Sequence, residues 1–222
     1  MDSPFLSYLV TCKNDGKSIL PLLSILKKYG SDDECIILDD YSDDEETLSV
    51  LDSLKTDNFF KIYKNHLNKN YGEHKNFGKS KCSGKYIFQI DSDEIPKENL
   101  LLNIKDIIIA NPQIELYWVP RINDFKGVTL DHARQWGWRL SEYDGRYIVN
   151  WPDRQTRIFL NVPRIKWVRP LHEKIEGAMV ITNLPDEFDF ALIHNKTIER
   201  QIETNIRYNR EFSEELNRGF KV

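Results

Sequence analysis

The sequence predicts an α/β protein: a mostly parallel central sheet flanked by helices, followed by a smaller mixed β lobe. Three observations support this prediction. Short apolar runs alternate with amphipathic segments over the first half of the chain, and these runs are apolar throughout rather than at every second residue. Continuous apolar strands are typical of parallel sheets that are covered on both faces. In the second half, helical periodicity gives way to short β-like segments.

Strand and helix signals alternate through residues 1–112. The helical segments repeat apolar residues every three or four positions, as Leu22 and Leu26 do. Ser42 is the expected N-cap of one helix, with Glu45 as its capping-box partner, and Gly84 is expected to close another. The expected strands are residues 5–10, 35–38, 59–63 and 86–90, and the expected helices are residues 16–29, the segment carrying Leu48, Leu51 and Leu54, and residues 73–81 and 97–110.

Residues 113–222 form the second half of what we expect to be one domain over residues 1–222. We find no internal repeat, low-complexity tract or linker between the halves, so we expect two fused lobes. The expected strands are residues 116–120, 156–160, 165–168, 179–181 and 190–194, followed by a closing helix over residues 197–216.

Composition narrows the class of protein. Hydrophobic residues make up 40% of the chain and charged residues 30%, which is the balance of a soluble globular protein. The net charge of −4 argues against a nucleic-acid binder that works by neutralising phosphates. No run approaches the roughly 20 apolar residues of a membrane span. We therefore expect no transmembrane segment, and peripheral membrane contact stays open.

The cysteines bear on the compartment. Cys12, Cys35 and Cys82 are scattered and odd in number, so we expect neither a disulfide framework nor a zinc site. Residues 1–4 lack the basic and apolar regions of a signal peptide. Both observations favour a reducing, cytoplasmic location.

Polar residues follow three of the predicted strands at the point where each strand ends. They are residues 11–15, the pair Asp39 and Asp40, and residues 91–94. Ligands of open α/β sheets bind in the crevice beyond the carboxyl ends of the strands. We therefore expect these three segments to line one ligand site.

Asp91 and Asp93 are the most informative of these residues. Alternate residues of a strand point to the same face, so the two carboxylates should lie together and repel each other unless a cation separates them. Hard oxygen ligands suit Mg²⁺ or Mn²⁺, which take one or two protein carboxylates together with substrate phosphates. A solvated acidic turn is the alternative for an isolated Asp-x-Asp.

The second strand ends in a further candidate ligand contact. Asp39 or Asp40 could accept hydrogen bonds from a base or a ribose hydroxyl, and the alternative is capping of the following helix. Neither a Gly-x-Gly-x-x-Gly nor a P-loop motif occurs. Phosphate charge would instead have to be met by a metal and nearby cations.

Two residues of the second half suggest chemistry. His194 ends a strand and is a chemically reasonable added ligand to a carboxylate-bound Mn²⁺, although rim histidines are usually structural. Glu173 lies close to Trp167 in the sequence, and aromatic surroundings would raise its pKa and suit a general base. The alternative for Glu173 is a surface ion pair with Arg169 or Lys174.

Aromatic and arginine residues crowd into residues 136–151. Aromatic faces bind the C–H faces of sugars and arginines bind phosphates, whereas core packing is the commoner role of tryptophan. The aromatic residues are Trp136, Trp138, Tyr143, Tyr147 and Trp151, and the arginines that accompany them are Arg134, Arg139 and Arg146.

Four segments, taken in order, resemble the family-2-type inverting glycosyltransferases of the GT-A fold. They are Leu-Ser-Tyr-Leu-Val-Thr-Cys-Lys-Asn at 6–14, Ile-Leu-Asp-Asp-Tyr-Ser-Asp-Asp at 37–44, Asn-Tyr-Gly-Glu-His-Lys-Asn-Phe-Gly at 70–78, and Gly-Lys-Tyr-Ile-Phe-Gln-Ile-Asp-Ser-Asp-Glu at 84–94. A weaker similarity runs over residues 153–195. The resemblance implies a GT-A (Rossmann-like) sheet whose first half binds a nucleotide sugar, with an acceptor-side second half.

The resemblance also implies roles for single residues. Asp91 and Asp93, with Ser92 between them, match the Asp-x-Asp that binds Mn²⁺ or Mg²⁺ and the donor, and His194 matches a late metal-binding histidine. Glu173 is the expected catalytic base and Asp153 is the second choice. The residues implied to contact the nucleotide sugar are Thr11, Asp39, Asp40, Lys75 and Asn76, besides Asp91 and Ser92.

The implied reaction moves a monosaccharide from a nucleotide-diphosphate sugar, with UDP favoured, to a hydroxyl of a glycan or glycoconjugate, with inversion. The stretch 136–151 would form the acceptor site or a lid over the donor. A non-catalytic module that binds nucleotide sugar or glycan is the alternative. A sugar-phosphate nucleotidyltransferase is less favoured, because residues 11–16 lack the Gly- and Arg-rich loop that holds a triphosphate.

Overall fold

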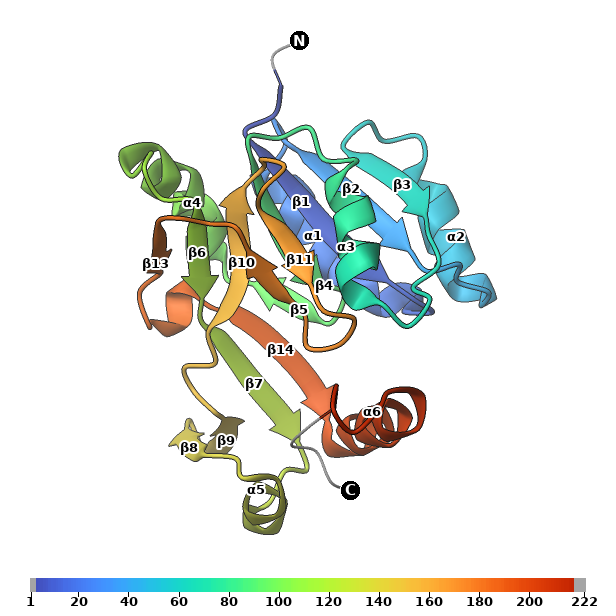
Figure 1. Cartoon of the computed structure of the whole chain (residues 1–222), viewed down its shortest axis with the longest axis vertical. Coiled ribbons are helices and arrows are strands. Elements are labelled where there is room, and N and C mark those ends of the chain that lie inside the picture. The colour runs from blue at the N-terminus through green and yellow to red at the C-terminus, as the bar shows by residue number, and fades with distance from the viewer. Residues whose placement is uncertain (1–2, 218–222) are drawn as a thin grey trace.

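The computed structural model describes residues 3–217 and confirms the α/β class (Figure 1). A central sheet of seven strands has the order β13-β6-β10-β4-β1-β2-β3. β10 runs antiparallel to both of its neighbours, while the other paired strands of this sheet are parallel. The strands are β1 Leu6–Cys12, β2 Glu34–Asp39, β3 Phe60–Lys64, β4 Tyr86–Asp91, β6 Leu116–Val119, β10 Gln155–Leu160 and β13 Ile181–Asn183.

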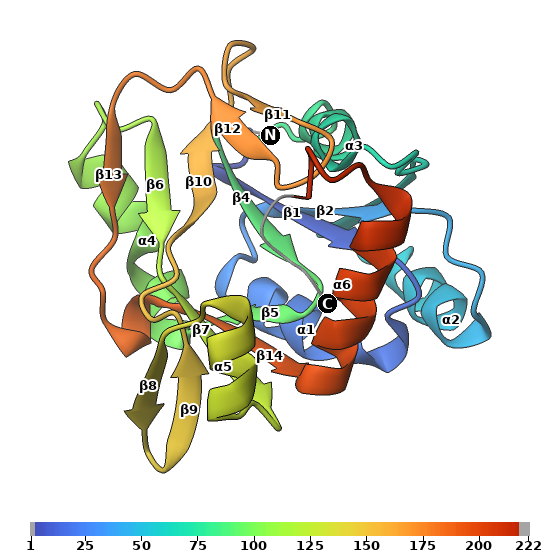
Figure 2. The same ribbon diagram turned by 60° about the horizontal axis from the view of Figure 1, so that its bottom comes forward.

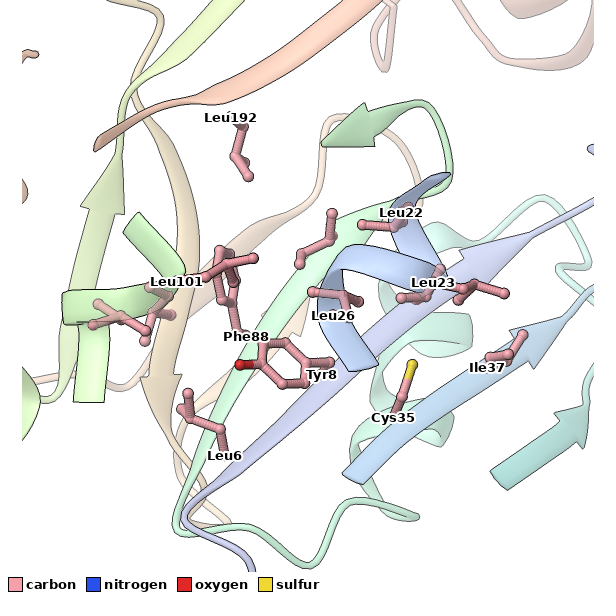
Figure 3. Packing of buried hydrophobic residues seen from close by; sticks show 14 of the residues in the cluster. Leu6, Tyr8, Leu22, Leu23, Leu26, Cys35, Ile37, Phe88, Leu101 and Leu192 are labelled. Atoms are coloured by element: carbon pink, nitrogen blue, oxygen red, sulfur yellow. The ribbon is translucent and has the colours of Figure 1, made fainter. Parts of the chain in front are cut away.

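Both faces of this sheet are buried, as the continuous apolar strands predict. One face packs against α1 (Leu20–Tyr29, after a 3-10 turn at Gly16–Ile19), α2 (Glu45–Leu54) and α4 (Glu98–Ala110). Figure 3 shows Tyr8 and Phe88 side by side in this core, with ring centroids 6.0 Å apart. The other face packs against α3 (Tyr71–Lys79) and the ribbon of β11 (Lys166–Val168) and β12 (Lys174–Glu176).

A second, smaller sheet supplies the expected mixed β lobe. Its strand order is β5-β14-β7-β9-β8, and β14 runs parallel to β7 but antiparallel to β5. β5 follows β4 after a two-residue turn, so the two sheets meet where the Asp-x-Asp segment lies. The elements of this lobe are β5 Glu94–Pro96, β7 Arg121–Lys126, α5 Leu130–Trp136, β8 Leu140–Tyr143, β9 Arg146–Val149, a 3-10 turn at Phe188–Phe190, β14 Leu192–Thr197 and α6 Ile198–Glu211.

Two of the predicted helix signals are wrong. Asp44, rather than Ser42, caps α2, because its side chain accepts the backbone N–H of Thr47 at 2.8 Å. Gly84 does not close α3, which ends at Lys79. Gly84 instead lies in the turn before β4, where an added Cβ would come within 2.6 Å of the Ser7 backbone nitrogen.

Other boundaries shift. The closing helix α6 stops at Glu211 instead of reaching residue 216, and β14 begins at Leu192 because residues 188–190 form a 3-10 turn. β5, β7, α5 and the β8–β9 hairpin were not predicted. Among residues 3–217, no helix is both long enough and apolar enough to cross a bilayer.

Candidate active site

A cavity of about 600 Å³ is lined by residues at the carboxyl ends of β1 and β4 and by residues of α6. Figure 2 shows α6 lying beyond the ends of these two strands. The strand ends contribute one wall, the turn between β11 and β12 contributes a second, and one face of α6 contributes the third. The predicted residues that line this cavity are Thr11, Asp40, Lys75, Asp91, Ser92, Asp93, Glu173 and His194.

Asp91 is held by cations on both of its oxygens. Oδ2 accepts a hydrogen bond from Arg157 Nη2 at 2.7 Å, and Oδ1 lies 3.3 Å from Lys75 Nζ. Gln89 Nε2 also donates to Oδ1 at 2.8 Å. Burial raises the pKa of Asp91, but Arg157 and Lys75 outweigh burial and hold that pKa well below its ordinary value. The Asp91 carboxylate is therefore ionised and already neutralised by side chains.

Asp93 contacts His194 in the cavity wall. Asp93 Oδ2 lies 3.3 Å from His194 Nε2, and the other ring nitrogen, Nδ1, lies 2.9 Å from Asn123 Oδ1. The Asn123 amide nitrogen donates to Asp153 Oδ2 at 2.8 Å, so Asn123 Oδ1 is an acceptor and His194 Nδ1 must donate to it. In a neutral ring this places the lone pair on Nε2, pointing at Asp93.

A metal would fit between Asp93 and His194. A carboxylate oxygen and an unprotonated ring nitrogen facing each other at 3.3 Å need a proton or a cation between them. The hydrogen bond on Nδ1 is the kind of outer contact that orients metal-binding histidines. Within the described part of the chain, no cluster of three or more His, Cys, Asp or Glu residues could hold a metal ion. These residues would thus offer a metal two donors, Asp93 and His194, because Asp91 is engaged by Arg157 and Lys75.

Glu173 lies on the far wall, in the turn between β11 and β12. Its Oε1 accepts a hydrogen bond from Lys75 Nζ at 2.6 Å, and Lys75 in turn reaches Asp91. Burial raises the pKa of Glu173, but the ion pair with Lys75 outweighs burial and holds that pKa below its ordinary value. The expectation that the pKa of Glu173 is raised is therefore wrong. The alternative, an ion pair with Arg169 or Lys174, is also wrong, because Glu173 pairs with Lys75. Glu173 is ionised, as a general base must be.

The Glu173 turn is pressed against α3. The backbone N–H of Tyr71 donates to Pro170 O at 2.9 Å, and an added Cβ on Gly72 would lie 2.6 Å from Arg169 O. Asn76 does not line the cavity, but it holds α3 against β11 beside this turn. Its amide donates to Trp167 O at 2.8 Å and accepts from Trp167 N at 3.0 Å, which joins α3 to β11.

Asp39 and Asp153 also lie outside the cavity lining. Asp39 is fully buried, and its Oδ1 accepts the backbone N–H of Ser42 at 2.9 Å, so it orders the loop before α2. Asp153 accepts two hydrogen bonds from Arg121, the one from Nε at 2.9 Å, in addition to the one from Asn123. In this structure both acids support cavity walls, whereas Asp40 lines the cavity itself.

The remaining part of the charge network is formed by Glu94, Arg121 and Arg157, whose pairing the sequence did not predict. Glu94 does not line the cavity, although residues 91–94 were expected to do so. Glu94 is fully buried and accepts hydrogen bonds from Arg121 Nη1 at 2.9 Å and from Arg157 Nη2. Arg157 bridges Glu94 to Asp91, and Arg121 bridges Glu94 to Asp153. The sequence does contain a signal for Arg157. This arginine directly precedes the apolar run at 158–160 of a core strand, and a charge buried there must be paired.

The aromatic stretch 136–151 does not reach the cavity: none of its residues is part of the lining. Trp136 and Trp138 pack on each other with centroids 4.7 Å apart, and Trp151 stacks on Phe188 at 4.4 Å. The structure therefore does not place a donor lid there. The wall opposite the strand ends comes from α6, for which the sequence predicts no part in the site.

Comparisons with known proteins agree with this architecture. S. aureus TarS 1-349 in complex with UDP-GlcNAc superposes with a TM-score of 0.62 at 17% identity, covering 86% of this chain and 58% of that one. The complex of TarS 1-349 with UDP gives 0.61 at 17% identity, covering 93% and 64%. The chain thus spans less than two thirds of these neighbours, and the likeness concerns the fold. A search of curated proteins found no match.

The sequence itself was also compared with family models. The model described as "Glycosyl transferase family 2" matches residues 7–169, which include all of β1 except its first residue, the strands β2 to β4 and the Asp-x-Asp segment. This match covers well over half of the chain and confirms the resemblance seen in the four motifs. The chain therefore belongs to glycosyl transferase family 2.

Proposed function

We propose that this transferase moves a monosaccharide from a UDP-sugar to a hydroxyl of a glycan or glycoconjugate, with inversion. The observation that carries the proposal is the linked placement of Glu173, Lys75 and Asp91 on one cavity. Lys75 is buried, and its Nζ lies 2.6 Å from Glu173 and 3.3 Å from Asp91. Lys75 therefore links the proposed base to the strand end where the donor would bind. The UDP and UDP-GlcNAc bound to TarS support a uridine donor.

In this proposal Glu173 accepts the proton of the acceptor hydroxyl. The acceptor oxygen bonds to the anomeric carbon as the bond from that carbon to the diphosphate breaks on the opposite face, which inverts the configuration. Glu173 suits the role because it is ionised and lines the cavity, whereas Asp153 is saturated by Arg121 and Asn123. We therefore assign the base to Glu173.

We assign metal binding to Asp93 and His194, because they form the two-donor pair described above. A bound Mn²⁺ or Mg²⁺ would supply positive charge to the leaving diphosphate. Asp91 contributes by fixing Lys75 and Arg157 at the same edge of the sheet.

Asp93→Ala is expected to remove metal dependence. The variant should lose Mn²⁺ binding and metal-stimulated turnover while keeping its melting temperature, because Asp93 is one of only two donors and its side chain is 29% exposed. Mn²⁺ titration by calorimetry or EPR checks this prediction. Asp32→Ala, an exposed acid before β2, is the control. Wild-type Mn²⁺ affinity in Asp93→Ala would remove the metal assignment.

Lys75→Met is expected to move the pH dependence of kcat/KM. Wild-type activity should stay level through neutral pH and fall only below the ordinary glutamate pKa of about 4.5, because Lys75 keeps Glu173 ionised. Without Lys75, burial and the Asp91 charge both raise the pKa of Glu173, so the acidic limb should shift to higher pH. A pH profile with an unmoved acidic limb would contradict the coupling.

Nucleotide binding and product formation test the function as a whole. UDP, GDP, CDP and dTDP are titrated with and without Mn²⁺, and radiolabelled UDP-sugars are then offered with hydroxyl acceptors. Tight binding of UDP together with glycoside formation is the expected result. Binding without any product would favour the non-catalytic module, and failure of all four nucleotides to bind would contradict the proposal.

A further inference from the structure

The central sheet ends in β13, and within residues 3–217 this strand pairs with β6 alone. On the β6 side, the Val180 carbonyl accepts the N–H of Glu115 at 2.9 Å, and Leu184 N donates to Trp118 O at 2.9 Å. Successive residues of a strand direct their backbone groups to alternate sides. The N–H and C=O groups of Ile181 and Asn183 therefore point away from the sheet, and they offer two donors and two acceptors to a further strand.

The other edge strands of the described chain carry residues that discourage such pairing. Charged side chains, lysine above all, and proline disfavour the addition of a strand to an exposed edge. These residues are Lys61 and Lys64 in β3, Pro96 in β5, Glu142 in β8, Lys166 in β11 and Lys174 in β12. β13 has no such protection, because the sequence from Gly177 to Leu184 contains neither a charged residue nor a proline.

Apolar side chains are exposed along the same edge. Met179 is 75% exposed and Ile181 is 50% exposed, and Val180 between them is exposed as well. Trp118 of β6 lies beside Asn183 in the register of the two strands and is also exposed. Large apolar side chains that gather on a surface mark a site of interaction. None of these residues lines the active-site cavity, so a contact here is independent of the proposed function.

The helix α4 extends this apolar surface. It lies next to β6 and β13 in both views of the molecule (Figures 1 and 2). Leu102 and Ile109 are exposed on α4, and they are seven residues apart, so two helical turns place them on one face. Specific interfaces bury about 1,200–2,000 Å² in total, which is more than a strand of three residues supplies. A stable contact at this edge therefore needs flanking apolar surface of this kind.

We propose that β13 pairs antiparallel with β13 of a second copy of this chain, about a two-fold axis at Thr182, and so joins two central sheets into one. Ile181 of one copy then lies opposite Asn183 of the second copy, and the two residues exchange a pair of N–H to C=O hydrogen bonds. The two-fold axis repeats this pair, which gives four hydrogen bonds. Pro185 has no N–H, so it limits the pairing to these residues.

Charge favours a second copy as the occupant of this edge. Self-pairing brings the same short segment from both copies together, so a strand with a charged side chain would face its own charge and be repelled. β13 carries no charge, and its central residue would form a Thr182–Thr182 pair, which is a favourable cross-strand contact. A charged partner strand would instead lose hydration against this neutral edge without gaining an opposite charge. The net charge of −4 opposes association only mildly.

Sedimentation velocity over a series of concentrations, on the full chain, tests this interface. The wild type is expected to shift from monomer to dimer as the concentration rises. I181K places a charge on the edge, and N183P removes one outward N–H from each copy and thus two of the four hydrogen bonds. Each variant is expected to weaken dimerisation by about tenfold or more. Both should keep the fold, as circular dichroism would verify, because these groups point away from β6.

L130K is the matched control and should dimerise like the wild type. Leu130 is 52% exposed, close to the value for Ile181, and it lies on α5 in the smaller lobe, apart from β13 (Figure 1). Hydrogen exchange gives a second readout: the amides of Ile181 and Asn183 should become more protected as the wild-type concentration rises.

Three results would overturn the proposal. The first is a wild type that stays monomeric at every concentration, and the second is a dimer that persists unchanged in both I181K and N183P, which would place the interface elsewhere. The third is protection of the Ile181 and Asn183 amides that does not depend on concentration, because this would show that the edge is covered within one chain.

Discussion

Glu173→Gln is expected to lower kcat by about 10² to 10⁴ while leaving UDP affinity within a fewfold of wild type. Glutamine keeps the size of the side chain and can still accept a hydrogen bond from Lys75, so the wall between β11 and β12 should stay in place. What is lost is a carboxylate that can take up the acceptor proton. Steady-state kinetics and UDP titration measured on the same protein check both parts.

The matched control for this prediction lies in the neighbouring strand. Glu176 is an exposed carboxylate three residues further on, in β12, and Glu176→Gln should leave kcat and UDP affinity unchanged. Loss of UDP binding in Glu173→Gln would point to a positioning role instead of proton transfer. Near wild-type kcat would reject Glu173 as the base and direct attention to Asp153.

Arg157→Met is expected to destabilise the fold by about 3–5 kcal/mol, the usual cost of removing one partner from a buried ion pair. Arg157 is 5% exposed and contacts Asp91 and the fully buried Glu94. Methionine fills much of the same volume but leaves two neighbouring carboxylates without this counter-charge. Urea unfolding at neutral pH measures the loss.

The pH dependence of this loss separates charge from packing. In the wild type, burial raises the pKa of Asp91 but Arg157 and Lys75 hold it well below 3.8, so its ionised form adds stability above that pH and loses it as the pH falls through the lowered pKa. Without Arg157, burial is opposed mainly by Lys75, and the variant should regain stability relative to wild type as Asp91 protonates. The gap between the two proteins should therefore narrow from about pH 7 toward about pH 4.

Arg154→Met is the matched control for Arg157→Met, because Arg154 lies three residues earlier in the chain. Arg154 pairs with Asp186, and both side chains are more than a third exposed, so its loss should cost no more than about 1 kcal/mol. A gap between Arg157→Met and wild type that does not change with pH would show that packing, and not the buried charges, dominates.

The sequence by itself determined the first half of the fold and the acidic strand ends. Strands β1, β2 and β4 are mostly apolar and almost entirely buried, and helices α1 and α4 repeat apolar residues on one face, so local patterns were enough to predict them. The position of the Asp-x-Asp segment could be predicted in the same way, because this segment follows a buried strand of a parallel sheet.

Local pattern failed where polar side chains are satisfied by distant partners. Strand β7 has the sequence Arg-Ile-Asn-Asp-Phe-Lys and looks like a loop, yet Arg121 and Asn123 bind Asp153 and thereby support His194. The prediction of Ser42 as the N-cap of α2 is wrong for a related reason. The Ser42 hydroxyl donates to Asp39 and does not cap the helix.

Only the tertiary structure decided which charges meet. Lys75 and Glu173 are 98 residues apart, Arg157 and Asp91 are 66 apart, and α6 brings Arg200 and Arg207 to the same cavity. Strand and helix periodicity arises from neighbours within one or two turns and is therefore written in the local sequence. Ion pairing between separate elements depends on how the two sheets and α6 pack, and no local pattern encodes that arrangement.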